Sequence, residues 1–488
     1  MSMPRPPLHA PWPAVHFVGV GGHSMSGLAS ALARLGVPVS GSDVAASART
    51  ARVAAAGVRV RLGHAAEAVL SLPPGALVVR NTDVPATNPE LLAAAARGLR
   101  IAHRSEVLAW FLHAGGPAAV AVTGTHGKST TTALCGLACL AAGLDPTVFV
   151  GADVPYLEGG NFRLGSGPVV AEADESDGSF LRYHPDVAVV TSAEPEHLEH
   201  YGGDFAAVLE AYRGFLGGLR RGGLAALCAD DPRLQGVAPA VPAGVELLWY
   251  GLGPGADLTA VDLRQGAEET RFQAHLRGEV LGDFRLKVPG RHNVADALAA
   301  LAVAHRLGCE GAAVVAAFAG FGGAVRRFEV LTQAGGVMVV DDYAHNPTKV
   351  AAALEGARQR ARGRVLGVFQ PHRYQRTAQL WDAFAPAFAG CDLLWLTDIY
   401  TPAGESPLPG VDGAAFAALV ARGSGIPVRY LPDPATVAPA CLRECRPGDL
   451  VLVMGAGDIT AVAHDLAQRL EGEPRAAEVK PHRGQPSA

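Results

Sequence analysis

The residues with the clearest chemistry form the segment Thr-Gly-Thr-His-Gly-Lys-Ser at positions 123–129. An apolar run at 119–122 precedes it, and an Ala/Leu/Cys-rich pattern with helical periodicity follows it. A strand, a glycine turn and a helix start in this order predict a phosphate cradle, because backbone N–H groups and the helix N-terminus both attract anions. Lys128 would reach the β- and γ-phosphates and the Ser129 hydroxyl would ligate Mg²⁺. The segment therefore predicts ATP as a ligand.

The segment is shorter than the general phosphate-loop pattern. The pattern G-x-x-x-x-G-K-[ST] needs a glycine at position 122, where this chain has Val122. The alternative interpretation is a glycine turn that carries a surface lysine. The strand, turn and helix context favours the phosphate site.

Two acidic clusters follow further apolar runs. Glu172-Ala-Asp-Glu-Ser-Asp-Gly-Ser179 comes after the run at 168–171, and Glu194-Pro-Glu-His197 comes after the run at 186–191. Ligands gather at the carboxyl ends of strands in α/β folds. Mg²⁺ prefers oxygen ligands, which Glu172 and Ser129 supply. A lone His197 would more commonly be a hydrogen-bonded core or loop residue.

A second glycine loop lies near the N-terminus. Gly19-Val-Gly-Gly-His-Ser-Met-Ser-Gly27 resembles the dinucleotide pattern G-x-G-x-x-G, with Ser24 at the third glycine position. Asp43 stands where such a fold places its ribose-binding acid. NAD is one possible ligand, and a nucleotide-sugar diphosphate fits the same N–H and helix-dipole chemistry. Tight strand–helix packing without a ligand is the third interpretation.

Bulk composition bounds the class of protein. At 488 residues the chain is long enough for roughly three domains. The formal net charge is −5 and no Lys/Arg cluster suggests nucleic acid or a membrane surface. The seven cysteines lack CxxC pairs, so the pairs 135/139 and 441/445 are interpreted as core residues rather than as a metal or redox site. No apolar run is long enough to span a bilayer, and a soluble cytoplasmic protein is predicted.

Three α/β blocks are predicted, each built on a mainly parallel sheet. We expect a disordered N-terminus at 1–14, a Rossmann-like domain at 15–113, a central P-loop ATPase-like domain at 118–323 with additional antiparallel strands at about 244–288, a Rossmann-like domain at 324–470 and a disordered tail at 471–488. Linkers are predicted at 114–117 and 320–323. The expected helices include 25–35 and 293–307, and the expected strands are near 15–20, 38–40, 119–122, 168–171, 186–191, 223–227, 337–341, 365–369, 393–397, 428–431 and 450–454.

Further polar motifs complete a specific set. They are Gly-Arg-His-Asn at 290–293, Asp-Asp-Tyr-Ala-His-Asn-Pro at 341–347, Phe-Gln-Pro-His-Arg-Tyr-Gln-Arg-Thr at 369–377 and Asp-Ile-Tyr-Thr-Pro-Ala-Gly-Glu at 398–405. With these motifs the chain resembles the Mur ligases, and within them the members that join L-alanine to UDP-N-acetylmuramate. The resemblance covers nearly everything from Val15 to Ala463.

The resemblance implies a function for each block. The first would hold UDP-N-acetylmuramate, the second ATP and Mg²⁺, and the third would bring L-alanine. ATP would phosphorylate the lactyl carboxylate of the sugar, and the amine of L-alanine would attack the acyl phosphate. A monomer or a homodimer is expected. The alternatives are a recycling ligase that joins a preformed tripeptide to the same sugar nucleotide, and a non-catalytic nucleotide-binding relative.

The resemblance also implies roles for individual residues. The catalytic set would be Lys128, Glu172, His197, His345 and Arg373, of which Glu172 and His197 join Ser129 as metal ligands. ATP would meet Gly124, Thr125, His126, Gly127, Lys128, Ser129 and Thr130, with Asn293 at the adenine and Arg326, Arg327, Asp341 and Asp342 at the rest of the nucleotide. The sugar nucleotide would meet Gly19, Gly21, Gly22, Ser26, Asp43 and His64, and the amino acid would meet Tyr343, His345, Arg373 and Arg376.

Several positions depart from the family pattern. Ser192 stands where an Asn is usual, Glu196 where an Asp is usual, and Asn346 where a His is usual. Asp296 replaces an Asn, and an ionised Asp only accepts hydrogen bonds whereas an Asn also donates them. A change in nucleotide affinity or selectivity is therefore expected from Asp296.

Overall fold

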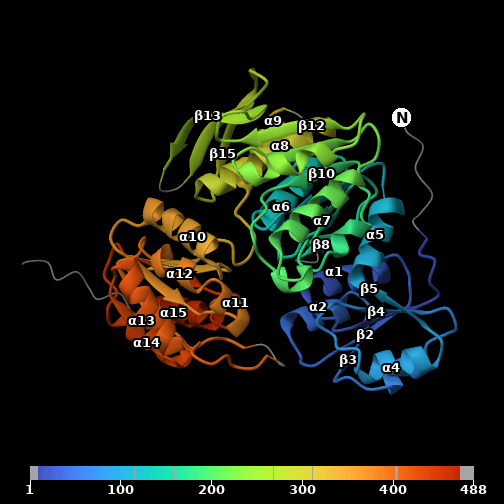
Figure 1. Cartoon of the computed structure of the whole chain (residues 1–488), viewed down its shortest axis with the longest axis horizontal. Coiled ribbons are helices and arrows are strands. Elements are labelled where there is room, and N and C mark those ends of the chain that lie inside the picture. The colour runs from blue at the N-terminus through green and yellow to red at the C-terminus, as the bar shows by residue number, and fades with distance from the viewer. Residues whose placement is uncertain are drawn as a thin grey trace, which may run out of the picture. The chain divides into compact units, whose positions relative to one another are not determined.

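The computed structural model describes residues 9–114, 116–157, 160–266, 269–309, 311–401 and 405–472. The chain divides into two compact units, Met1–Val325 and Arg326–Ala488, which Figure 1 shows in blue to yellow and in orange to red. Among the described residues the first unit holds two sheets and the second holds one. No described helix has both the length and the apolar character needed to cross a membrane. The boundaries that the sequence predicts at 114–117 and 320–323 stay predictions.

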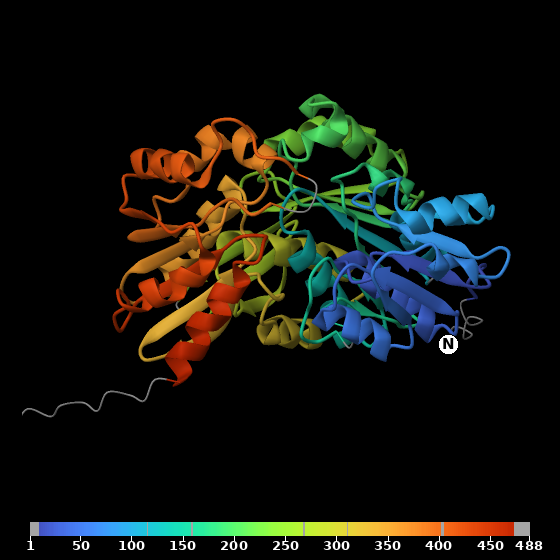
Figure 2. The ribbon, with the colours of Figure 1, turned by 90° about the horizontal axis from the view of Figure 1, so that it is seen from below.

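The N-terminal sheet is parallel throughout and positions the first glycine loop. Its strands lie in the order β3 (Arg59–Leu62), β2 (Val39–Asp43), β1 (Val15–Val18), β4 (Leu77–Arg80) and β5 (Arg100–His103). Its helices are α1 (His23–Arg34), α2 (Ala48–Ala55), α3 (Glu67–Leu70), α4 (Pro89–Ala96) and α5 (Arg104–Ala114). Figure 2 shows this sheet in blue, flanked by its helices. From β1 the sheet grows toward β2 and β3 on one side and toward β4 and β5 on the other. α/β folds bind ligands at the carboxyl end of the strand where the order reverses in this way.

The residues before β1 are ordered by packing. The sequence predicts disorder for 1–14; residues 1–8 lie outside the described part of the chain, but residues 9–14 do not fit that prediction. The Trp12 ring makes an edge contact with Trp110 on α5, with ring centroids 5.5 Å apart, and Ala14 is buried. The edge contact of Trp12 and the burial of Ala14 pack this short segment against the core.

The central sheet joins a parallel part that carries the phosphate loop to an antiparallel extension. Its strands lie in the order β15 (Glu279–Leu286), β14 (Thr270–Leu276), β13 (Leu258–Gln265), β12 (Glu246–Gly251), β11 (Leu224–Cys228), β10 (Val187–Val190), β6 (Ala119–Thr123), β9 (Val169–Glu172), β7 (Thr147–Phe149) and β8 (Phe162–Arg163). The pairs β13/β14, β14/β15 and β7/β8 are antiparallel, and the other neighbours are parallel. Of the region predicted at about 244–288 to hold antiparallel strands, β13, β14 and β15 pair antiparallel as expected, whereas β12 is parallel to both of its neighbours.

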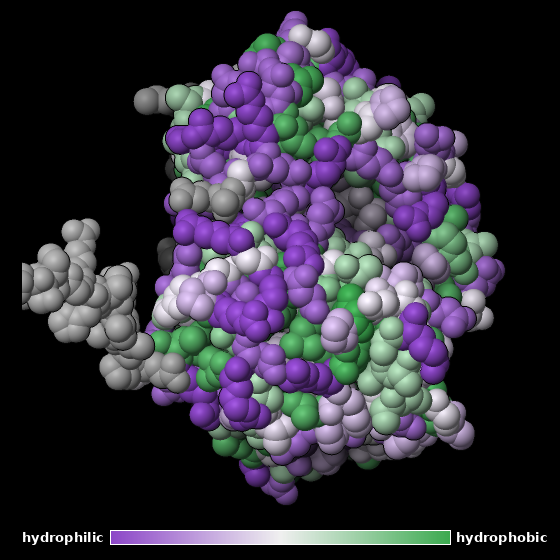
Figure 3. All heavy atoms as spheres, turned by 90° about the vertical axis from the view of Figure 1, so that its left-hand side faces the viewer, coloured by the Kyte–Doolittle hydropathy of each residue, from purple (hydrophilic) through white to green (hydrophobic). Residues whose placement is uncertain are grey.

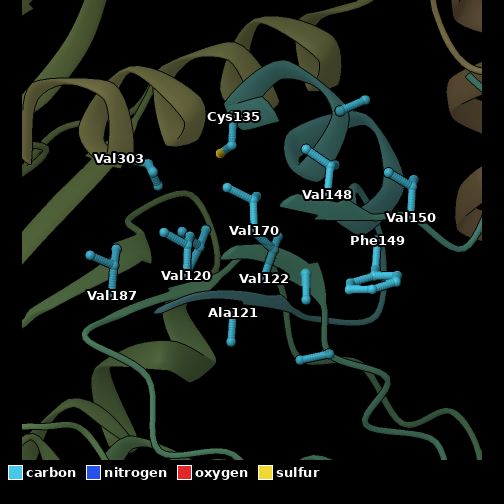
Figure 4. Packing of buried hydrophobic residues seen from close by; sticks show 14 of the residues in the cluster. Val120, Ala121, Val122, Cys135, Val148, Phe149, Val150, Val170, Val187 and Val303 are labelled. Atoms are coloured by element: carbon cyan, nitrogen blue, oxygen red, sulfur yellow. The ribbon is translucent and has the colours of Figure 1, made fainter. Parts of the chain in front are cut away.

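Helices cover this sheet and bury its apolar side chains. They are α6 (Lys128–Ala141), α7 (Phe205–Gly217), α8 (Arg291–Arg306) and α9 (Ala312–Gly320), with the 3₁₀ turns η1 (Ser179–Arg182), η2 (Leu198–Tyr201), η3 (Pro232–Gly236) and η4 (Ala238–Ala240). Figure 4 shows Val120 and Val122 of β6 pointing toward the side of Cys135 and Val303, while Ala121 points the other way. Both faces of β6 are buried, which explains its uninterrupted apolar sequence.

The sheet of the second unit is parallel except at one edge. Its strands lie in the order β16 (Glu329–Ala334), β17 (Val337–Asp342), β21 (Leu450–Met454), β18 (Val365–Phe369), β19 (Leu393–Leu396) and β20 (Val428–Tyr430). Its helices are α10 (Pro347–Arg360), α11 (Tyr374–Gln379), α12 (Trp381–Ala387), α13 (Gly413–Ser424), α14 (Val437–Leu442), α15 (Thr460–Gly472) and the 3₁₀ turn η5 (Pro434–Thr436). On the face seen in Figure 3, hydrophilic residues are spread among smaller groups of hydrophobic ones.

Two details of this unit differ from the sequence prediction. The edge strand β16 was not predicted and runs antiparallel to β17. Gly335 and Gly336 connect the two strands with φ angles of 61° and 80°, and two left-handed residues in a row are what a two-residue hairpin turn requires. The helix α15 continues to Gly472, so residues 471–472 are helical, and residues 473–488 of the predicted tail lie outside the described residues.

Candidate functional site

The predicted phosphate loop lies between β6 and α6. Gly124 and Gly127 take φ angles of 131° and 77°, in the region that favours glycine, and Gly127 directly precedes the first residue of α6. The Thr125 N–H donates to the Ser192 carbonyl and the His126 N–H donates to the Ser192 hydroxyl, both at 3.0 Å. Ser192, a departure from the family pattern, therefore holds the loop by its backbone and its side chain together.

The loop is also fixed through its side chains. The Thr125 hydroxyl accepts a hydrogen bond from the Glu194 N–H at 2.8 Å, and the His126 Nε2 lies 2.8 Å from a Glu194 carboxylate oxygen. The predicted acidic cluster that begins at Glu194 thus contacts the loop directly. It orders the residues just before Lys128.

Lys128 is held by two kinds of acceptor. Its ammonium donates to the Gly124 carbonyl at 2.6 Å and to both carboxylate oxygens of Glu175, at 3.0 and 2.9 Å. Burial alone would lower the pKa of Lys128, but the carboxylates of Glu175, Asp174 and Glu172 outweigh it and keep that pKa above its usual value. Burial raises the pKa of Glu175 to about 7, against the attraction of Lys128. Lys128 is therefore a charged, pre-positioned donor at the mouth of the loop.

Ser129 and Glu172 are brought together, as predicted. The Ser129 hydroxyl donates to Glu172 Oε2 at 2.9 Å, and the Gly151 N–H donates to the same oxygen at 2.7 Å. A hydroxyl and a carboxylate beside a phosphate loop are the hard oxygen donors that Mg²⁺ prefers, with waters and phosphate oxygens completing its shell. No group of three or more His, Cys, Asp or Glu side chains arranged to hold a metal was found in the part of the chain that the structure describes. The donor set accordingly fits a magnesium ion that arrives with a nucleotide.

His197 and Asn293 are two predicted site residues whose roles stay predictions. His197 has a φ angle of 56° and precedes η2, with its Nε2 3.9 Å from Glu196 Oε2. Asn293 lies in the first turn of α8, is almost fully buried, and donates from its amide to the Pro289 carbonyl at 2.5 Å. The hydrogen bond to Pro289 orients the Asn293 amide.

Asp296 packs directly on the phosphate loop. It is 6% exposed, and a Cβ atom added at Gly127 would stand 2.2 Å from its Oδ1. The carboxylate of Asp296, where the family usually has an amide, therefore lies against the backbone that begins α6. This contact supports the expected effect of Asp296 on nucleotide affinity.

Replacement of Gly127 by alanine is expected to weaken nucleotide binding by about tenfold or more. The left-handed backbone costs an alanine about 1–2 kcal/mol, and the added methyl group must also displace Asp296. Isothermal titration calorimetry with ATP and Mg²⁺ measures the change.

The matched control is Gly143→Ala at the other end of the same helix. Gly143 has a φ angle of 74°, close to that of Gly127, but an added Cβ would meet nothing within 4 Å. Both variants carry the strain of a left-handed alanine, but only Gly127→Ala must also displace Asp296, so only that variant should lose affinity. Equal affinities in the two variants would refute the role of the Gly127–Asp296 contact.

The first glycine loop is held by Asp43. The Gly21 N–H donates to Asp43 Oδ2 at 2.8 Å, and a Cβ added at Gly21 would stand 2.8 Å from the same oxygen. The Arg49 guanidinium donates to the Gly21 carbonyl at 2.9 Å and contacts His23 Nε2 at 2.7 Å. The structure thus places the predicted ribose acid against the loop and adds Arg49, a cation beside the loop that was not predicted.

Gly19, Gly22 and Ser26 complete the turn into α1, and His64 borders it. Gly19 has a φ angle of 81°, its carbonyl accepts from the Gly22 N–H at 3.1 Å, and Ser26 donates to the His23 carbonyl. His64 Nδ1 lies 3.0 Å from the Ser42 hydroxyl and 3.1 Å from the buried Glu90 carboxylate. These contacts fix the His64 ring at the end of β3.

The second unit gathers its predicted nucleotide residues around one aromatic ring. The guanidinium carbons of Arg326 and Arg327 lie 5.1 and 5.0 Å from the centre of the Tyr343 ring, and the Tyr343 N–H donates to the Arg326 carbonyl. Asp341 is fully buried, 3.4 Å from Arg326 Nε, and Asp342 accepts from two backbone N–H groups. Burial raises the pKa of Asp342 to about 6, although Arg327 opposes it.

The predicted amino-acid residues lie in the same unit. His345 packs edge-on against Tyr343 with ring centroids 5.0 Å apart. Burial, together with the charges of Lys349 and Arg376, holds the pKa of His345 well below its usual value. A neutral imidazole orients an amine by accepting its hydrogen bond, but so weak a base retains a proton poorly. Whether His345 orients or deprotonates the amine stays a prediction.

Arg373 and Arg376 flank a stacked pair of rings. Arg373 has a φ angle of 69° and its N–H donates to the Tyr400 carbonyl at 2.9 Å. Arg376 Nη1 lies 3.1 Å from His372 Nδ1, and the His372 ring stacks on Tyr400 at 5.3 Å. Burial and the Arg376 charge lower the pKa of His372 to about 3, so the ring is neutral. The left-handed backbone at Arg373 directly precedes α11, and the ring stack lies beside this first turn of the helix.

Sequence reasoning missed several residues at these sites. Glu175 and Asp174 belong to the acidic motif that was identified, but only Glu172 was given a role. Asn161, which lies just before β8 and donates to Ser26 Oγ and to the His23 carbonyl, carries no sequence signal. The loop after β21 does carry one, because Gly455-Ala-Gly-Asp458 repeats the order of strand, glycine turn and helix, and Gln370 donates to Asp458 at 2.8 Å within it.

Comparison with known proteins matches three family models along the chain. They are described as the Mur ligase family catalytic domain over residues 14–115, the Mur ligase middle domain over 122–304, and the Mur ligase glutamate ligase domain over 326–457. UDP-N-acetylmuramate–L-alanine ligase from Symbiobacterium thermophilum is 49% identical over 94% of both chains. The enzyme of the same name from Kineococcus radiotolerans is 46% identical over 93% of this chain and 96% of its own.

Solved structures agree with these matches. The UDP-N-acetylmuramate–alanine ligase from Thermotoga maritima superposes with a TM-score of 0.79 and 27% identity, over 94% of this chain and 99% of the other. A murein peptide ligase from Psychrobacter arcticus shares the fold, with a TM-score of 0.69 and 20% identity over 94% of this chain and 99% of its own. The predicted fold, with its mainly parallel sheets, is confirmed. The chain belongs to the Mur ligase family.

Proposed function

We propose that this protein is an ATP-dependent ligase that joins L-alanine to the lactyl carboxylate of UDP-N-acetylmuramate, a step in the synthesis of peptidoglycan precursors. The observation that carries the proposal is the likeness, over almost the whole chain, to ligases of that name. The reaction would release ADP and phosphate as it forms the amide. A cytoplasmic location accompanies this proposal, because the nucleotide substrates are found there.

The phosphate-loop geometry supports the first chemical step. A carboxylate that attacks the γ-phosphoryl group of ATP meets electrostatic repulsion, and fixed positive charge lowers this barrier. Lys128 already lies in the mouth of the loop, and the first N–H groups of α6 add the helix dipole. These groups would align the γ-phosphate with the attacking carboxylate. They would also stabilise the charge that develops on the phosphate oxygens.

Ser129 and Glu172 would hold the magnesium ion. Bound Mg²⁺ neutralises charge on phosphate oxygens and orients the leaving ADP. The Gly151 N–H and the Ser129 hydroxyl both donate to Glu172 Oε2, so the carboxylate is oriented before a cation binds. His197 is proposed as a further ligand.

The second unit would supply the amine. Arg373 and Arg376 would bind the α-carboxylate of alanine, since planar guanidinium groups suit a carboxylate better than an ammonium does. His345 and Tyr343 would orient the amine toward the acyl phosphate. Attack by the amine would give a tetrahedral species that expels phosphate and leaves the amide.

A panel of acceptors tests this proposal. The purified protein, with ATP, Mg²⁺ and UDP-N-acetylmuramate, should release phosphate when L-alanine is added, and more slowly with glycine or L-serine. Omission of either the sugar nucleotide or the amino acid should stop the release. The chromatographic product should carry one alanine.

Two other outcomes would reject the assignment. Turnover with the tripeptide but not with free L-alanine would identify a recycling ligase. ATP binding by calorimetry without phosphate release under any acceptor would identify a non-catalytic nucleotide-binding relative.

A further inference from the structure

The acidic segment at residues 172–177, which begins at the last residue of β9, contacts the phosphate loop through two of its members. Glu172 accepts the Ser129 hydroxyl, and Glu175 accepts the Lys128 ammonium with both oxygens. Glu175 is 6% exposed at its side chain, so its pairing with Lys128 is nearly sealed from water. The segment thus governs where the loop lysine lies.

Two other members, Asp174 and Asp177, reach the N-terminal sheet instead. Arg104, the first residue of α5, pairs with Asp174 through an Nη2–Oδ2 contact of 2.8 Å. The Thr82 hydroxyl donates to Asp177 at 2.5 Å, and His103 Nε2 lies 3.5 Å from the same carboxylate. Both attachments come from the carboxyl ends of β4 and β5. The acidic segment therefore links the sheet that carries the first glycine loop to the phosphate loop.

Asp174 pairs with Arg104 at 2.8 Å and directly precedes Glu175, the residue that binds Lys128 with both carboxylate oxygens. Arg104 and Lys128 are the two charges that most favour its ionised form. Arg104 is 12% exposed and stands at the start of a helix, so its position is set by the N-terminal sheet. Lys128 ends in a compact ammonium on a flexible chain, which moves more readily than a planar, paired guanidinium.

We propose that Arg104 is a positioning residue for Lys128. By neutralising Asp174, Arg104 leaves the Lys128 ammonium bound to Glu175 and Gly124 alone, aimed along the loop toward a phosphate. Without Arg104, the charge of Asp174 draws Lys128 sideways, and the γ-phosphate must compete with two carboxylates for one ammonium. The inference rests on the proposed use of ATP and adds an energetic connection from the sugar-nucleotide sheet to the ATP loop.

The test is a double-mutant cycle. Arg104→Gln should raise the KM for ATP by about tenfold, within the usual range for coupled sites, while the KM for L-alanine stays unchanged. Adding Asp174→Asn to that variant removes the surplus charge and should restore the KM for ATP to within about threefold of the parent. Loss of fold alone would not be reversed by a second substitution.

The matched control is Arg100→Gln. Arg100 pairs with Glu106 at 2.7 Å at the opposite end of β5 but is 63% exposed, and its removal should leave both KM values unchanged. Calorimetric binding of ADP with Mg²⁺ gives the same comparison without any ligation step. Failure of the parent protein to ligate would reject the proposed function, yet the calorimetric cycle would still test Arg104.

Two results would overturn the inference. One is an ADP affinity in Arg104→Gln equal to that of the parent. The other is a weakened affinity that Asp174→Asn does not rescue, since this would show that Arg104 acts through folding and not through the charge of Asp174.

Discussion

Replacement of Lys128 by alanine should lower the turnover number by about a hundredfold to a thousandfold, the loss typical of a removed transition-state donor. Lys128 provides the one side-chain ammonium that the structure places at the mouth of the phosphate loop, among the residues described, and it is bound to the Gly124 carbonyl and Glu175. Its loss would also leave Glu175 without its partner beside the incoming γ-phosphate. Phosphate release under saturating substrates measures the effect.

Lys287→Ala is the matched control for Lys128→Ala. The chain has only four lysines, at 128, 287, 349 and 480, and Lys287 is exposed near the end of β15. The control should keep the parent rate. A Lys128→Ala protein that turned over at a normal rate would reject the phosphate-loop assignment.

Replacement of Glu172 by glutamine should lower the turnover number by about a hundredfold or more and raise the Mg²⁺ concentration needed for half-maximal rate. The amide oxygen of glutamine still accepts the Gly151 N–H and the Ser129 hydroxyl, so the local fold should persist. What disappears is the negative charge that binds the cation. A magnesium titration of phosphate release separates the lower turnover number from the weaker binding of Mg²⁺.

Glu210→Gln serves as the control for this charge change. Glu210 is 72% exposed on α7 and forms a surface pair with Arg213. An unchanged magnesium requirement in Glu172→Gln would show that the ion, if bound, is held elsewhere. A fall in thermal stability shared by both variants would have no bearing on the metal.

Local sequence patterns predict most elements of this fold. The strands β18 and β21 have the predicted bounds 365–369 and 450–454, and the helix predicted at 293–307 is observed at Arg291–Arg306. These segments are uniformly apolar strands or periodic helices, so their own residues specify them. β16 was missed because its exposed and buried residues alternate irregularly across a bulge between Val330 and Thr332.

The contacts of the candidate sites also divide into those that local sequence predicts and those that it does not. The sequence by itself determined the phosphate loop and the pair of Ser129 and Glu172, because a loop that follows a strand and begins a helix is a local feature, and parallel strands bring their carboxyl ends to one edge. Only the tertiary structure decided that Glu175 binds Lys128, that Asp43 holds Gly21, and that Arg104 meets Asp174 from 70 positions away in the chain. The physical reason is that a side-chain ion pair depends on the distance between charges in space, and no periodicity in the sequence records that distance.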